Sequence, residues 1–166
     1  IIIGEDNKKP CVPWSLVLAN PSFGTLVSDK SLGFTWAVNS RENKLTPWSN
    51  DTRTDNTGEM LILKFRNKSY DLIRNSTVEF CPDYARYTGK AGEVEYEVTV
   101  KVPEKGMMKV CELKLKNKSP VQIKTCAIYY TEPVLGVDRE HERFVRTDRI
   151  GSGIVMTSAY SEIKGF

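Results

Sequence analysis

Strict two-residue alternation of apolar and polar side chains is the feature that most limits what this chain can fold into. It is clearest from Glu93 to Val102, where valines and one tyrosine at even positions alternate with glutamate, threonine and lysine at odd positions. Because successive side chains of a β-strand point to opposite faces, this pattern predicts a strand with one buried and one solvated face. A helix would need apolar residues at intervals of three and four, a spacing that almost never occurs in this sequence.

Similar alternating segments recur along the chain as pairs, and turn residues lie between the two members of each pair. The pairs are 25–28 with 34–38, 60–66 with 70–74, and 111–116 with 121–130. Each pair is predicted to form two adjacent antiparallel strands. Short strands bounded by turn signals favour an all-β fold, an antiparallel two-sheet β-sandwich, over a parallel α/β sheet that would need crossover helices.

One stretch departs from this rhythm. Asp138 to Arg146 is rich in charged residues and poor in β-branched ones, so we expect a short surface helix there. Gly151-Ser152-Gly153 precedes a strand-like run, and we interpret it as a tight turn rather than a phosphate-binding loop. With 166 residues the chain suits a single domain, residues 1–166, whose core needs no metal or disulfide.

The charge distribution argues against two classes of partner. The 24 basic and 21 acidic side chains give a net charge of +3 and are interspersed, which predicts neither nucleic acid nor an anionic membrane as partner. Lysines between Lys109 and Lys118 alternate with apolar residues, and we interpret them as the solvated face of a strand. No apolar run approaches the roughly 20 residues needed to cross a bilayer, and Ile1-Ile2-Ile3 is too short for the core of a signal peptide. We therefore expect a cytoplasmic protein, and its start without methionine predicts a segment of a larger polypeptide.

Residues with reactive side chains do not form a catalytic or metal-binding motif. His141 is the only histidine and lies in a charged run, which argues against histidine-based catalysis and against a histidine metal site. The cysteines lack the close spacing of zinc or redox motifs, so we interpret all four as reduced and buried. They are Cys11, Cys81, Cys111 and Cys126. We expect no metal, no cofactor and no catalytic residue in this chain.

The segment 33–51, GFTWAVNSRENKLTPWSND, has the residue mix of a sugar-facing loop. The indoles of Trp36 and Trp48 could cover the apolar face of a pyranose ring, and the Arg41-Glu42-Asn43 triplet offers planar groups that hydrogen-bond hydroxyls in fixed directions. The alternative is that both indoles belong to the core and the polar groups fix a long connection by bonding backbone atoms. Both interpretations stay open at the level of sequence.

Short motifs in the first 60 residues, taken in chain order, carry a family resemblance. They are Pro13-Trp14-Ser15, Leu18-Ala19-Asn20-Pro21, Phe23-Gly24, Val27-Ser28, Gly33-Phe34-Thr35-Trp36, Asn39-Ser40-Arg41-Glu42-Asn43, Leu45-Thr46-Pro47-Trp48-Ser49-Asn50-Asp51 and Gly58-Glu59. This series resembles the N-terminal β-sandwich of glycoside hydrolase family 94. Within the family it is most similar to the 1,2-β-oligoglucan phosphorylases and to the phosphorylase-like part of cyclic β-1,2-glucan synthases. Beyond Glu59 the resemblance rests on strand rhythm and on Val110 to Ser119.

The resemblance implies a galactose-mutarotase-like super-sandwich that supports an (α/α)6 catalytic barrel and a homodimer in a larger inverting phosphorylase. In such an enzyme a barrel aspartic acid protonates the glycosidic oxygen, and inorganic phosphate attacks the anomeric carbon as co-substrate. The chain itself would be non-catalytic and, since family sandwiches are generally longer, would lack strands at its carboxyl end.

The resemblance also implies a ligand and the residues that contact it. A β-glucan oligosaccharide, with β-1,2 linkage favoured, would meet a loop of the sandwich. Arg41, Glu42 and Asn43 are the candidates for hydroxyl contacts, and Trp48 or Trp36 is the candidate stacking platform. Two other functions stay open: an independent carbohydrate-binding module, and a purely structural or dimerising element without sugar contact.

Overall fold

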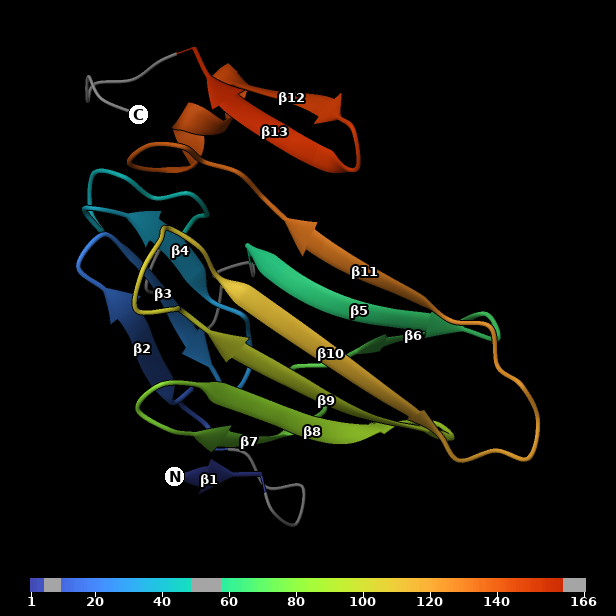
Figure 1. Cartoon of the computed structure of the whole chain (residues 1–166). Coiled ribbons are helices and arrows are strands. Elements are labelled where there is room, and N and C mark those ends of the chain that lie inside the picture. Colours follow the sequence, from blue (N-terminus) through green and yellow to red (C-terminus); the bar gives the residue numbers. More distant parts are fainter. Residues whose placement is uncertain (5–9, 49–57, 160–166) are drawn as a thin grey trace.

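A computed structural model describes residues 1–4, 10–48 and 58–159, and it is built almost entirely of antiparallel strands (Figure 1). The strands are β1 (Ile2–Ile3), β2 (Ser15–Asn20), β3 (Phe23–Ser28), β4 (Phe34–Ala37), β5 (Glu59–Phe65), β6 (Lys68–Asp71), β7 (Thr77–Phe80), β8 (Ala85–Ala91), β9 (Val94–Lys101), β10 (Val110–Asn117), β11 (Cys126–Thr131), β12 (Val145–Ile150) and β13 (Gly153–Ser158). The expected all-β antiparallel sandwich is confirmed.

The two layers of the sandwich differ in construction. One layer is a five-stranded sheet in the order β1-β7-β8-β9-β10. The other layer consists of two three-stranded sheets, β2-β3-β4 and β11-β5-β6, which lie behind and beside the first in Figure 1. Lys44 links β4 to the segment that follows β11, because it forms isolated β-bridges to Trp36 on one side and to Gly136 on the other. The segment around Lys44 is therefore a seam within the second layer.

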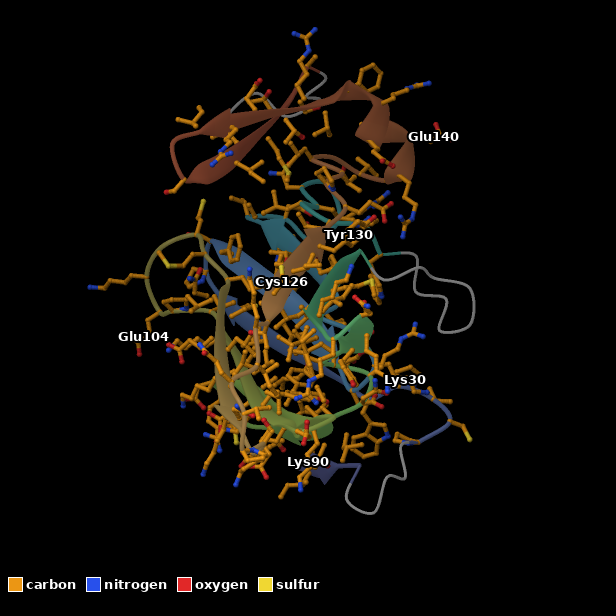
Figure 2. All side chains as sticks on the ribbon, turned by 90° about the vertical axis from the view of Figure 1, so that its right-hand side faces the viewer. Lys30, Lys90, Glu104, Cys126, Tyr130 and Glu140 are labelled. Carbon is orange, nitrogen blue, oxygen red and sulfur yellow. The ribbon has the colours of Figure 1, made fainter. Side chains whose placement is uncertain are left out.

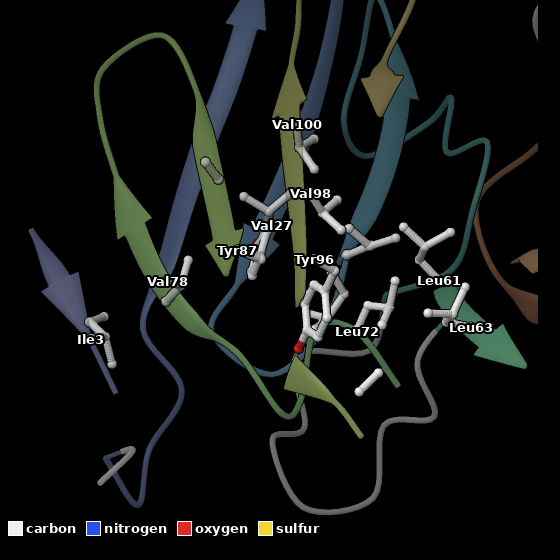
Figure 3. Packing of buried hydrophobic residues seen from close by; sticks show 14 of the residues in the cluster. Ile3, Val27, Leu61, Leu63, Leu72, Val78, Tyr87, Tyr96, Val98 and Val100 are labelled. Carbon is white, nitrogen blue, oxygen red and sulfur yellow. The ribbon is translucent and has the colours of Figure 1, made fainter. Parts of the chain in front are cut away.

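The core lies between the layers, and the alternation of β9 shows how it forms. Val94, Tyr96, Val98 and Val100 are buried, while the residues between them are only half-buried. These four side chains pack with residues from β1, β3, β5, β7 and β8 (Figure 3). The period-two pattern therefore predicted both the strand and the face that it buries.

Charged residues occupy the outward face of the five-stranded sheet and pair across its strands. Arg86 on β8 contacts Glu79 on β7 at 3.0 Å and Glu97 on β9 at 3.9 Å, and Glu97 contacts Lys114 on β10 at 2.8 Å. The predicted position on a solvated strand face is therefore confirmed for Lys114, but it is wrong for Lys109. The Lys109 side chain is only 7% exposed, since it precedes β10 and turns inward to an acidic partner described below.

Two of the three predicted strand pairs are correct. β3 pairs with β4, and β5 pairs with β6. The predicted pairing of 111–116 with 121–130 is wrong: β10 pairs with β9, whereas β11 pairs with β5 in the other layer. The Asn117 and Ser119 side chains hydrogen-bond locally around Pro120, which cannot donate to a sheet, and the chain then crosses between the layers before β11 begins.

The expected short surface helix is present as a six-residue 3-10 helix, Arg139–Phe144, capped by the Asp138 side chain. It ends before Arg146, because β12 begins at Val145. The expectation for the cysteines needs correction. The cysteines are all unpaired, but none is fully buried: Cys11 and Cys126 are exposed, and Cys81 and Cys111 are half-buried. Cys126 is exposed because β11 is an edge strand, which has a neighbour on one side only. The glycine-containing turn between β12 and β13 was predicted correctly, with Gly151 at a φ of 59°.

Within the described residues, the search for a helix of sufficient length and apolar character to span a bilayer finds none.

A buried hydroxyl gives a test of how the layers are joined. Tyr87 on β8 donates a hydrogen bond of 2.9 Å to the Ser28 carbonyl on β3, whereas the buried hydroxyl of Tyr96 has no hydrogen-bond partner among the described residues. Tyr87→Phe should therefore lower the free energy of unfolding by about 1–3 kcal/mol. Tyr96→Phe is the matched control and should leave it unchanged or raise it, as measured by urea denaturation. Equal losses in both variants would contradict the assigned bond.

Candidate functional site

A buried cluster around the carboxylate of Glu59 fixes the segment that the sequence singled out. Thr35 and Thr46 donate hydrogen bonds to its Oε1 at 2.6 and 2.8 Å. Lys109 and Tyr129 donate to its Oε2 at 2.6 and 2.5 Å. These five residues, here called the Glu59 cluster, come from β4, the seam, β5, the approach to β10 and β11, so they join both layers of the sandwich.

Electrostatics keep the cluster charged although it is buried. Burial on its own would raise the pKa of the Glu59 carboxyl, but the Lys109 ammonium and the donated hydrogen bonds outweigh this effect and lower the pKa below its usual range. Burial and the neighbouring Glu59 carboxylate raise the pKa of Tyr129, which keeps its hydroxyl a donor. Lys109 also donates to the Leu32 carbonyl at 2.9 Å. A carboxylate with four donors is a structural anchor and is unsuited to proton transfer.

The cluster holds the segment that leads to Trp48. Thr46 Oγ1 accepts a 2.8 Å hydrogen bond from the Thr35 amide while it donates to Glu59. The Pro47 ring then lies against Gly58, where an added Cβ would be only 2.7 Å from Pro47 Cδ. The backbone immediately before Trp48 is therefore held in one position by Thr46 and Pro47.

Three aromatic rings form a continuous stack on β4 and beside it. Phe34 lies parallel to Trp48, with ring centroids 4.8 Å apart and planes at 5°, and its centroid is 5.0 Å from that of Trp36. Phe34 is buried beneath the two indoles, and Trp48 is 39% exposed. Gly24 on β3 makes room for Trp36, because a Cβ at this position would lie 2.3 Å from Trp36 Cζ2.

The turn after β4 presents the other three predicted site residues in different ways. The Asn39 side chain accepts hydrogen bonds from the Arg41 and Glu42 amides, which shapes the turn. The Arg41 side chain is 86% exposed, and its Nε lies 3.2 Å from Glu42 Oε1. Asn43 is buried, and its backbone bonds Ala37 and Asn39. Arg41 and Glu42 can therefore meet a ligand, whereas Asn43 serves the turn.

The structure brings some predicted site residues together and separates others. Trp36 and Trp48 share contact with Phe34. In the described part of the chain, no hydrogen bond, ion pair or cation–π contact joins Arg41 to an indole. Exposed and buried side chains therefore occur side by side in this segment: Arg41 and Trp48 are exposed, whereas Asn43 is buried.

Sequence reasoning missed Glu59, Lys109, Tyr129 and Phe34 as parts of the site. One signal could have found the glutamate: it alternates in phase with Leu61, Leu63 and Phe65, so it occupies a core-facing position. A carboxylate at such a position requires buried donors. The sequence alone could not identify those donors, because Lys109 and Tyr129 are 50 and 70 residues away from Glu59 along the chain.

Other features of the described residues do not add to this site. A search there for three or more metal-ligating side chains in one place finds no such group. An open pocket lined by Arg139, Glu140, Glu142 and Arg143 lies on the 3-10 helix, and none of these four residues belongs to the Glu59 cluster or to the aromatic stack.

Comparison with known proteins gives two matches. The family model of the glycosyl hydrolase 94 supersandwich domain matches residues 1–163. The chain is also 30% identical, over 162 residues, to the cyclic beta-(1,2)-glucan synthase NdvB of Rhizobium meliloti (strain 1021). That alignment covers 90% of this chain and 6% of the synthase, so the chain spans a small fraction of the length of its relative.

The Glu59–Lys109 pair can be tested with a double-mutant cycle. Glu59→Gln or Lys109→Met alone leaves a buried partner uncompensated, and each should lower the free energy of unfolding by about 3–5 kcal/mol. The double variant should lose clearly less than the sum, because no charge then remains buried. Urea denaturation of the four proteins measures this coupling, and additive losses would contradict the pair.

The lowered pKa of Glu59 also predicts a pH dependence. An unfolded glutamate has a pKa of about 4.3. Since the folded value is lower, the stabilisation is fully present above the unfolded pKa and is lost as pH falls through the folded one. The difference in unfolding free energy between the native chain and Glu59→Gln should therefore shrink between about pH 6 and about pH 3. A difference independent of pH would mean that Glu59 is not ionised in the folded chain.

Proposed function

The chain belongs to the glycosyl hydrolase 94 supersandwich family, and from this premise we propose that it is the non-catalytic sandwich domain of a larger enzyme acting on β-linked glucooligosaccharides. The family match over residues 1–163 is the observation that carries the proposal. The described residues agree with a non-catalytic role, because both fully buried carboxylates are bound within the fold: Glu59 is engaged by four donors, and Asp29 accepts a hydrogen bond from the Trp14 amide.

The proposed substrate is a β-1,2-linked glucan. The relative with 30% identity is named as a cyclic beta-(1,2)-glucan synthase, and this similarity favours β-1,2 over other linkages. The reaction we propose for the larger enzyme is phosphorolysis with inversion, in which an aspartic acid outside this chain protonates the leaving oxygen and inorganic phosphate attacks the anomeric carbon. The sandwich would contribute position and support rather than a reacting group.

The proposal includes partners and a location. The partners are an (α/α)6 barrel of the same polypeptide or of a partner chain, and a second copy of the enzyme in a homodimer. We place the enzyme in the cytoplasm, because the four cysteines are unpaired and thiols persist in a reducing compartment.

Arg41 and Glu42 are the residues that we propose to reach substrate hydroxyls at the mouth of the barrel. Among the described residues, the one ion pair of the Arg41 side chain is with Glu42, and it leaves the other guanidinium donors for a ligand. Asn43 contributes indirectly by closing the turn that carries them. An exposed ion pair of this kind is worth about 0–1 kcal/mol to stability, so a large effect of substitution on kinetics would point to substrate contact.

Two other functions are each favoured by one observation. The exposed indole of Trp48 favours an independent carbohydrate-binding module, which requires sugar binding by the chain alone. Exposed apolar side chains on β11 favour a structural or dimerising element; they include Ile128 and Tyr130, and Figure 2 labels Tyr130. Titration of the chain with β-1,2-glucooligosaccharides, together with sedimentation analysis, separates these two.

Kinetics of the intact enzyme test the proposal. Arg41→Ala should raise KM or lower kcat for a β-1,2-glucooligosaccharide, with kcat/KM falling about tenfold for the loss of one charged hydrogen bond. Arg74→Ala is the matched control, because Arg74 is also exposed and lies 3.9 Å from its neighbour Asp71. Unchanged kinetics in both variants would remove Arg41 from the substrate site, and an enzyme inactive on all β-glucans would overturn the proposed function itself.

A further inference from the structure

The two outward faces of the sandwich have opposite chemistry. The outward face of β7-β8-β9-β10 carries the row of ion pairs through Glu79, Arg86, Glu97 and Lys114. The outward face of β2-β3-β4 carries no charged side chain in its two central cross-strand rows. Strand register defines these rows as Val17, Leu26 and Phe34, and Ala19, Gly24 and Trp36.

This second face is outward because the opposite side chains of the same strands point into the core. Leu18 and Val27 belong to the main core cluster, whereas Phe34 does not. Thr35 lies between Phe34 and Trp36 and points inward to Glu59. The face of β2-β3-β4 is therefore turned away from the five-stranded sheet, behind the molecule in Figure 1.

The platform of this face consists of the exposed indole of Trp48, the half-buried indole of Trp36 and small residues beside them. Trp48 rests on Phe34 with one face, so its exposed area comes from the other face and the ring edge. Trp36 lies over Gly24, and the neighbouring Ala19 is exposed. The exposed Val17 continues the surface past the rings. Since the Glu59 cluster fixes Thr46 and Thr35, the platform is held in place before any ligand arrives.

Size and charge decide which class of ligand fits. Two rows across three strands cover an area on the order of 150 Å². A stable protein interface buries about 800 Å² on each partner. Two or three pyranose rings match the smaller area, and an uncharged sugar matches the two uncharged rows. Lys44 lies beside Trp36 at the edge of these rows, and its ammonium group donates a hydrogen bond to the Val137 carbonyl. The turn that carries Asn39 and Arg41 follows Trp36 at one end of this sheet and offers hydrogen-bonding groups there.

We propose that the outward face of β2-β3-β4, with Trp36 and Trp48 as stacking rings, is a binding surface for a β-linked glucan chain. The identity of the sugar rests on the proposed function, while the surface itself rests on the register and the ring geometry. The surface is a sheet face with a fixed aromatic platform, and it would hold a glucan without help from a catalytic barrel.

Titration of the 166-residue chain with β-1,2-glucooligosaccharides of defined length, followed by calorimetry and tryptophan fluorescence, tests this surface. Trp48→Ala should weaken binding about tenfold or more, because it removes one stacking ring. Trp14→Ala is the matched control: Trp14 is also exposed but precedes β2, at the end of the sheet opposite Trp36, and its removal should leave binding unchanged.

A second pair of variants leaves the rings intact. Val17→Lys places a charge on the proposed surface and should weaken binding, whereas Thr88→Lys places the same charge on the ion-paired face beside Glu97 and should not. Circular dichroism confirms that each variant is folded. Binding that survives both Trp48→Ala and Val17→Lys, or a native chain that binds no β-glucan, would overturn the proposal.

The outcomes also separate this inference from the proposed function. An intact enzyme active on β-1,2-glucan together with a chain that binds no sugar would refute only the surface. A chain that binds β-glucan, with an intact enzyme that is inactive on it, would refute only the proposed function. Self-association of the chain that Val17→Lys abolishes, without sugar binding, would assign the face to a protein contact and overturn the proposal.

Discussion

The arrangement of this sandwich depends on one carboxylate that is buried with its charge. Glu59 occupies a core-facing position of β5, where an unpaired charge would not be tolerated. It is retained because Lys109 neutralises it and three hydroxyl groups donate to it. Each donor belongs to a different part of the chain, so satisfying this single group fixes where those parts lie.

The position of Trp48 on Phe34 shows how the Glu59 cluster orders a surface residue. Trp48 follows directly on Thr46 and Pro47, and both are held, one by Glu59 and the other against Gly58. The ring is thereby presented on Phe34 of β4, although Trp48 itself lies outside any strand. The position of this exposed indole is therefore determined by contacts inside the sandwich.

The local alternation of side chains predicted the strands, but it did not predict which strands pair when they are far apart in the sequence. The valines of β9 were assigned to a buried face from alternation alone, and the structure agrees. β11 was paired with the wrong neighbour, because alternation defines a strand and its faces but not the strand beside it. The prediction that Lys109 lies on a solvated face was wrong for the same reason. A lysine in an alternating segment fits such a face, and only the distant Glu59 explains why its side chain turns inward. The motif residues of the candidate site were recognised as a set, but their division into anchors, turn formers and exposed groups required coordinates.

The pairing of β11 with β5 in the second layer has a consequence for how the chain folds. Hairpins such as β2-β3 and β8-β9 close over short loops and can form early. β11 must instead return to β5 across about 65 residues, and until it arrives Tyr129 cannot reach Glu59. The docking of β11 is thus also the step that completes the hydrogen bonding of the buried carboxylate. Closure of the sandwich should be cooperative, since an intermediate with layers collapsed and β11 undocked would bury a charge that lacks a partner hydroxyl.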